Sequence, residues 1–157
     1  MTIDECAALL EADLRKCHDG EDPNDLPRFA VKSFRAAEKK LDVRLPESWL
    51  RLLPHAHEVI WNSERPDDYC SIYTPDSMVK WNEPFRNSAA EWPPYDAPRW
   101  LKFGSTDGGD EFTFDLESPA MPQDARVVWW CHETGEPEKE WAGVVEFIQD
   151  MLAPGHE

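Results

Sequence analysis

The feature that most constrains the fold is a pair of alternating apolar segments separated by a glycine turn. Apolar and polar residues alternate along 100–103 and again along 111–116. Between them, Asp107-Gly108-Gly109 supplies residues that accept positive φ at little steric cost. The segment does not fit an EF-hand, which requires acids at alternating positions and a glutamate at the twelfth. The pattern therefore predicts an antiparallel hairpin with one buried face.

Helical periodicity dominates the N-terminal third of the chain. Apolar residues recur at intervals of three and four over residues 3–18 and 27–41, which predicts two amphipathic helices. The acidic segment 19–25 between them holds turn formers and no apolar residue, so we expect a loop there. A short third helix is predicted from Pro46 to about Pro54, because proline favours the first helical position.

The rest of the chain alternates between strands, loops and helices. Strands are predicted at 59–61, 69–73 and 126–131, where β-branched and aromatic residues are bounded by turns. We also predict a small helix that Thr74 or Asp76 caps and that ends at Lys80 or Trp81. An ordered proline-rich loop is predicted over 82–98, because proline does not continue regular elements. A last helix is predicted over 141–152 and begins with Trp141, which we expect in the core.

The order of these elements is helices first, then strands, then one helix. Such an order is typical of an α+β fold, in which a mostly antiparallel sheet is packed with N-terminal helices and one C-terminal helix. A length of 157 residues fits one domain. We therefore expect a single domain over residues 1–157.

Charge is the strongest compositional signal. The chain has 16 Lys and Arg against 32 Asp and Glu, a formal net charge of −16. From Asp107 to the end there are thirteen acidic residues and two basic ones, so this third alone carries −11. Such a field repels phosphate backbones and anionic lipids, which argues against direct binding to nucleic acid or membrane. It also steers a basic protein partner toward the chain.

No motif for enzymatic chemistry stands out. The sequence has no GxxxxGK[ST] or GxGxxG phosphate loop and no GxSxG elbow. The segments His55-Ala56-His57-Glu58 and Cys131-His132-Glu133 contain zinc-ligand residue types, but neither has an established spacing. We therefore expect solvated or capping histidines, no cofactor, no metal and no catalytic residue.

The cysteines and the N-terminus indicate the compartment. Four cysteines are widely spaced and form no CxxC pair, as expected of reduced thiols. The first residues are acidic, unlike a signal peptide, and no stretch reaches the roughly 20 apolar residues that span a bilayer. We predict a cytoplasmic protein.

Three segments resemble the SUKH superfamily, the Smi/Knr-type domains. Residues 37–49 are similar to the family's charged helix and its Leu-Gly-Val-x-Leu-Pro step, except that Asp42 stands in place of the usual glycine. Residues 103–116 resemble its glycine-rich hairpin that ends in Phe-Asp-Leu, and 127–135 its strand and His-Glu turn. A further departure is 53–57, where many members carry Asn-Gly. The resemblance covers about 26–153 and leaves a separate N-terminal helix and acidic loop over 1–25.

The resemblance implies a non-enzymatic domain that binds proteins. Bacterial members are mostly immunity proteins that neutralise polymorphic toxins, often nucleases, whereas some eukaryotic relatives are regulatory scaffolds in cell-wall synthesis. The small size favours the immunity branch, with a cognate toxin that has a basic surface as the partner. A regulatory module with an endogenous partner is the alternative, and a carboxylate-based hydrolase is the third hypothesis. We expect the partner to contact acids and aromatics of the C-terminal half: Asp107, Asp110, Glu111, Glu133, Glu136, Glu138, Glu140, Trp92 and Tyr95.

Overall fold

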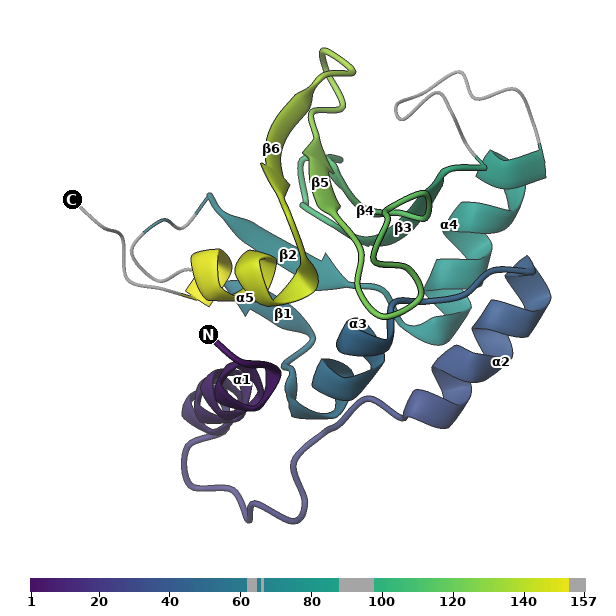
Figure 1. Ribbon diagram of the computed structural model, residues 1–157. Helices are drawn as coiled ribbons and strands as arrows, with labels where there is room; N and C mark the ends of the chain where they lie inside the picture. Colours follow the sequence, from purple (N-terminus) through teal and green to yellow (C-terminus); the bar gives the residue numbers. More distant parts are fainter. Residues whose placement is uncertain (62–64, 66, 88–97, 153–157) are drawn as a thin grey trace.

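The computed structural model describes residues 1–61, 65, 67–87 and 98–152 (Figure 1). Within them lie helices α1 (Ile3–Cys17), α2 (Val31–Leu41), α3 (Glu47–Leu52), α4 (Pro75–Asn87) and α5 (Val144–Leu152), and a 3-10 turn η1 (Leu53–His55). The strands are β1 (Val59–Trp61), β2 (Tyr69–Ile72), β3 (Trp100–Ser105), β4 (Glu111–Asp115), β5 (Val127–Trp130) and β6 (Pro137–Trp141). Each strand pairs antiparallel with the next to form one six-stranded sheet. The predicted α+β fold and the predicted hairpin are confirmed.

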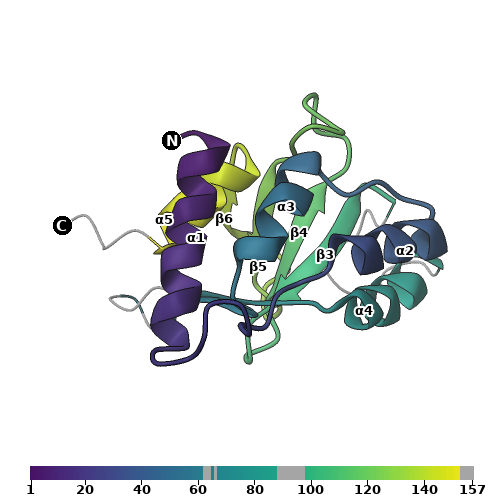
Figure 2. The same cartoon turned by 90° about the horizontal axis from the view of Figure 1, so that it is seen from below.

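The helices cover the sheet unequally. Helices α1, α3 and α5 pack on one another, and α5 also contacts β1 and β6, whereas α2 and α4 lie side by side at the other flank (Figure 2). Because side chains alternate along a strand, β3–β5 have two different faces. We call the face that carries Phe103, Phe112 and Phe114 the core face, and the opposite face, with Trp100 and Trp130, the outer face.

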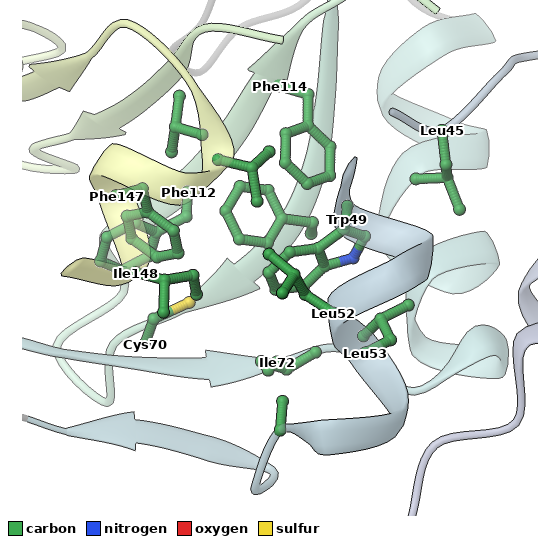
Figure 3. Close-up of a cluster of buried hydrophobic side chains, with 14 of the residues drawn as sticks. Leu45, Trp49, Leu52, Leu53, Cys70, Ile72, Phe112, Phe114, Phe147 and Ile148 are labelled. Atoms are coloured by element: carbon green, nitrogen blue, oxygen red, sulfur yellow. The ribbon is translucent and has the colours of Figure 1, made fainter. Parts of the chain in front are cut away.

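Aromatic rings fill the centre of the core. Trp49 of α3 is 1% exposed, and its ring centroid lies 4.9 Å from that of Phe103 and 5.5 Å from that of Phe114 (Figure 3). From the other side, the ring of Phe147 in α5 packs edge-on against Phe103 at 5.7 Å. Burying an aromatic ring contributes about 2–3 kcal/mol. These contacts hold α3 and α5 on the strands that carry the functional residues.

The end of the chain departs from the sequence prediction. Residues 137–141 form strand β6, which pairs with β5, and the last helix begins only at Val144. Trp141 is therefore a strand residue, although its expected place in the core is correct, since it is 3% exposed and donates its indole N–H to Asp150 at 3.0 Å. The Pro-Glu-Lys-Glu segment has little strand propensity of its own, so pairing with β5 decides its conformation.

Helix α4 is longer than the sequence predicts. The Thr74 hydroxyl accepts a hydrogen bond from the Ser77 amide at 3.2 Å, which confirms the expected cap. The helix then continues through Pro84 to residue 87, where a loop was predicted. Asn82, fully buried, explains the extension: its amide donates to the Lys102 carbonyl and its oxygen accepts from the Lys102 amide, both at 2.8 Å. This anchor on β3 offsets the proline's missing N–H.

One smaller difference concerns the start of α2. The helix begins at Val31 rather than at residue 27. It ends at Leu41, as predicted, and the capping residue Asp42 has a left-handed backbone with φ of 52°. Glycine adopts this conformation freely, and aspartate is among the few other residues that tolerate it. Asp42 therefore preserves the backbone turn at the position where the SUKH pattern has glycine.

Candidate functional site

Two hairpin turns meet at one end of the sheet. Because β3 to β6 form an antiparallel meander, the β3–β4 turn and the β5–β6 turn lie at the same end (Figure 1). One oxygen of Asp110 accepts hydrogen bonds from the His132 amide at 3.0 Å and the His132 ring at 2.6 Å. Its other oxygen accepts the Trp129 indole N–H at 3.0 Å. We call residues 106–111 and 131–138 the hairpin end.

Glycines allow the two turns to approach each other. Gly109 has φ of 99°, and a Cβ atom there would lie 3.5 Å from the His132 ring. Gly135, in the second turn, has φ of 72°. The Thr106 hydroxyl accepts the Asp110 amide at 3.2 Å and closes the first turn. The local sequence therefore forms the turns, and Asp110 joins them.

The pKa of Asp110 lies below its ordinary value. Burial on its own would raise this pKa, but the hydrogen bonds from His132 and Trp129 stabilise the charged form and outweigh burial. Asp110 is thus a link within the protein. Its charge is already engaged by internal donors, so it is a poor candidate for direct contact with a partner.

Two further predicted contact residues are also engaged internally. One Glu111 oxygen accepts the Tyr73 hydroxyl at 2.7 Å, and the other contacts the Lys102 ammonium at 3.3 Å. Burial raises the pKa of Glu111, although Lys102 and Tyr73 oppose the shift. Glu140 pairs with Arg126 at 2.9 Å. Glu111 belongs to the hairpin end, and Glu140 lies further along β6, opposite Val128. Each of the two carboxylates already has an internal partner.

The remaining predicted acids are free. Asp107, Glu133, Glu136 and Glu138 are exposed, and within the described part of the chain their carboxylates form no hydrogen bond or ion pair. All four belong to the hairpin end, so the fold gathers them on two linked turns. The two predicted aromatic contacts, Trp92 and Tyr95, lie outside the described residues.

Sequence reasoning missed Asp115, which lies at the opposite end of β4. Its side chain is 4% exposed and accepts hydrogen bonds from Arg99 at 2.9 Å and from Arg126 at 3.0 and 3.2 Å. Burial alone would raise the pKa of Asp115, but Arg99, the Glu117 amide and Arg126 lower it below its ordinary value. We call these three side chains, Asp115, Arg99 and Arg126, the arginine clamp. Alternation along β4 suggests only that Asp115 faces away from the core, not which cations meet it.

The histidines of the two zinc-like segments have separate partners. The His55 ring contacts Glu11 at 3.0 Å, the His57 ring accepts the Val59 amide at 3.2 Å, and His132 binds Asp110. In the described ranges, no three His, Cys, Asp or Glu side chains are grouped so that they could hold a metal ion. Nor does any helix in those ranges have the length and apolarity needed to cross a membrane.

Comparison with known proteins identifies a family that matches most of the chain. The model of the SMI1 / KNR4 family (SUKH-1) matches residues 31–150. The match begins at the first residue of α2 and ends within α5, so it includes both turns of the hairpin end and leaves α1 outside. No curated protein matches the chain.

Proposed function

Since the chain belongs to the SMI1 / KNR4 family (SUKH-1), we propose that it is an immunity protein that binds and neutralises a cognate toxin. SUKH domains are generally immunity proteins rather than enzymes. The toxin in this proposal is a polymorphic or secreted nuclease used in competition between bacteria. Inhibition needs no catalysis by this chain, because covering the toxin's active site or its substrate surface is sufficient.

The free carboxylates of the hairpin end carry the proposal. An enzyme that grips nucleic acid presents Lys and Arg to the phosphates. Asp107, Glu133, Glu136 and Glu138 offer unpaired negative charge to such a surface, and Asp110 holds their two turns together. An interface that is already ordered loses little conformational entropy on binding. We therefore propose that the hairpin end docks on the basic surface of the toxin.

The net charge supports rapid capture of such a partner. At −16 the whole chain attracts a basic protein, and this attraction accelerates encounter more than it strengthens the final complex. We place the encounter in the cytoplasm. The four cysteines are free thiols, as expected in a reducing compartment.

The partner can be identified by capture. The tagged chain is incubated with extract of its native host, and bound proteins are eluted with a salt gradient and identified by mass spectrometry. The proposal expects a stoichiometric basic partner that is toxic when expressed alone and harmless when co-expressed with this chain. A non-toxic housekeeping partner would instead support a regulatory interaction module.

A matched pair of triple variants then tests the surface. The first variant is Glu133→Gln, Glu136→Gln and Glu138→Gln, and the second is Asp19→Asn, Asp25→Asn and Asp67→Asn, which removes three exposed acids elsewhere. Both variants change the net charge equally. We expect the first to lower the association rate with the toxin about tenfold at low salt and the second to change it much less. Equal effects of the two variants would remove the hairpin end from the interface.

A further inference from the structure

A partly buried tryptophan adjoins the hairpin end on the outer face of the sheet. Trp130 lies on β5, opposite Glu111 of β4 and Pro137 of β6 in the strand register. Its indole N–H is donated to the Thr113 hydroxyl at 3.0 Å, and its ring packs edge-to-face on Trp100 with centroids 5.2 Å apart. Two contacts thus fix the orientation of a ring that stays partly open to solvent.

The neighbouring ring already binds guanidinium groups. The Cζ atom of Arg99 lies 4.9 Å from the ring centroid of Trp100, and that of Arg126 lies 5.5 Å from it. In the described part of the chain, no cation lies over the Trp130 ring. Tryptophan binds cations better than the other aromatic residues, and arginine is the cation found most often in such contacts. The Trp100–Trp130 pair therefore has one ring occupied by arginines of this protein and one ring available.

The charges around Trp130 favour an incoming cation. On the β6 side, the free carboxylates Glu136 and Glu138 flank Pro137, the residue opposite Trp130. Two cations of the outer face are already bound to acids: Lys102 contacts Glu111 at 3.3 Å, and Arg126 contacts Glu140 at 2.9 Å and Asp115 at 3.0 Å. A cation that approaches this edge of the sheet is thus attracted by two uncompensated carboxylates of β6 and its preceding turn, and Trp130 offers it an unoccupied ring.

We propose that Trp130 is the anchor of the partner interface and that its ring receives an arginine side chain of a basic protein. The free carboxylates of Glu136 and Glu138 draw the guanidinium toward this edge of the sheet by charge. Tryptophan and arginine are the residue types most enriched among interface residues that dominate binding. This inference rests on the proposed function and adds the residue chemistry by which the toxin is recognised.

Peptides can test the anchor before the toxin is known. The probes are a capped tetra-arginine peptide and a capped tetra-lysine peptide, which carry equal charge. Binding is followed by NMR through the eight tryptophan indole N–H signals, with that of Trp130 assigned from the spectrum of Trp130→Phe. We expect the arginine peptide to shift the Trp130 signal and to bind about fivefold more tightly than the lysine peptide, since stacking favours guanidinium.

Matched variants separate stacking from charge. Trp130→Leu should abolish the preference for arginine over lysine, and Trp130→Phe, which keeps an aromatic ring, should retain part of it. Trp61→Leu is the control, because Trp61 is 54% exposed on β1, at the other edge of the sheet. An unchanged arginine preference in Trp130→Leu would overturn the anchor.

The anchor and the proposed function can fail separately. Suppose that neither peptide shifts the Trp130 indole signal, while the Glu133, Glu136 and Glu138 triple variant binds both peptides less tightly. The hairpin end then binds cations by charge alone, and the anchor is wrong. If that triple variant binds both peptides as tightly as the Asp19, Asp25 and Asp67 variant, then the free carboxylates, which carry the proposed function, do not attract cations.

Discussion

The acidic residues at the two ends of strand β4 differ in whether cations of the protein neutralise them. At one end, the arginine clamp surrounds Asp115 with two guanidinium groups and buries it. At the other, the hairpin end exposes four carboxylates that form no ion pair with any described residue. Both ends lie in the acidic C-terminal third of the chain. The difference shows that local cation supply, and not the density of acids in the sequence, separates structural acids from acids available to a partner.

The physical consequences of the two ends also differ. A buried carboxylate is stable only while its cations and hydrogen bonds remain, so removing it leaves two guanidinium groups poorly compensated. Exposed carboxylates on neighbouring turns repel one another and contribute little to the free energy of unfolding. Four predictions follow this contrast from the clamp to the turns.

The largest effect is expected from Asp115→Asn. Asparagine keeps the shape but loses the charge that holds Arg99 and Arg126, so we expect the free energy of unfolding to fall by about 3 kcal/mol. Urea denaturation at pH 7 measures the change. Asp107→Asn, in the exposed turn, is the control and should stay within about 0.5 kcal/mol of the wild type. A loss below 1 kcal/mol for Asp115→Asn would mean that the clamp is not structural.

Lowering the pH should reduce the difference in free energy of unfolding between the wild type and Asp115→Asn. Because the pKa of Asp115 is lower in the folded state, its contribution is complete above the unfolded aspartate value of about 3.9 and is lost as the pH falls through the folded pKa. The stability gap between wild type and Asp115→Asn should therefore narrow below pH 4. Urea denaturation at pH 7, 5, 4, 3 and 2 follows the gap, and a gap that stays constant down to pH 2 would contradict this origin.

An intermediate effect is expected from Asp110→Asn. The substitution weakens the charge-assisted bonds to the His132 amide and ring and turns an amide toward Trp129, at a cost of about 1–2 kcal/mol. Hydrogen exchange of the Trp129 indole N–H should also accelerate, which reports separation of the two turns. An unchanged exchange rate would show that the turns stay together without Asp110.

The smallest effect on stability is expected from the triple variant of Glu133, Glu136 and Glu138. Replacing these free carboxylates with glutamine should change the free energy of unfolding by less than about 0.5 kcal/mol. The change should be a slight stabilisation, because it relieves repulsion between the carboxylates. Thermal and urea denaturation both measure it. A loss above 1 kcal/mol would place these acids in the structural class with Asp115.

Local patterns made most of the elements predictable. The hairpin over 100–116 could be predicted because its alternation and its glycines lie within a few residues of one another. Strand β6 and the second half of α4 could not, because β6 depends on pairing with β5, and α4 on the contact of Asn82 with β3. Propensity is a weak signal when a distant segment supplies the hydrogen bonds.

The sequence predicted which region holds the candidate site, but not which of its acids are free to meet a partner. The sequence points to the acids around the two turns, and six of the seven predicted acids lie in the hairpin end. Glu140 lies further along β6, where it pairs with Arg126 of the arginine clamp. The sequence does not reveal that Asp110, Glu111 and Glu140 have internal partners, nor that Trp130 adjoins the free acids. Those facts depend on side chains that are distant in the sequence and that the folded sheet brings into reach: His132 and Trp129 for Asp110, Tyr73 and Lys102 for Glu111, and Arg126 for Glu140.

By itself, the sequence determined the α+β fold, the hairpin, the SUKH resemblance and the acidic character of the C-terminal third. Each of these depends on residue type and short-range spacing, which are fixed along the chain. Only the tertiary structure decided which carboxylates are neutralised and which remain free. An ion pair requires a distance of about 4 Å, and that distance is set by how the antiparallel strands align their side chains across the sheet.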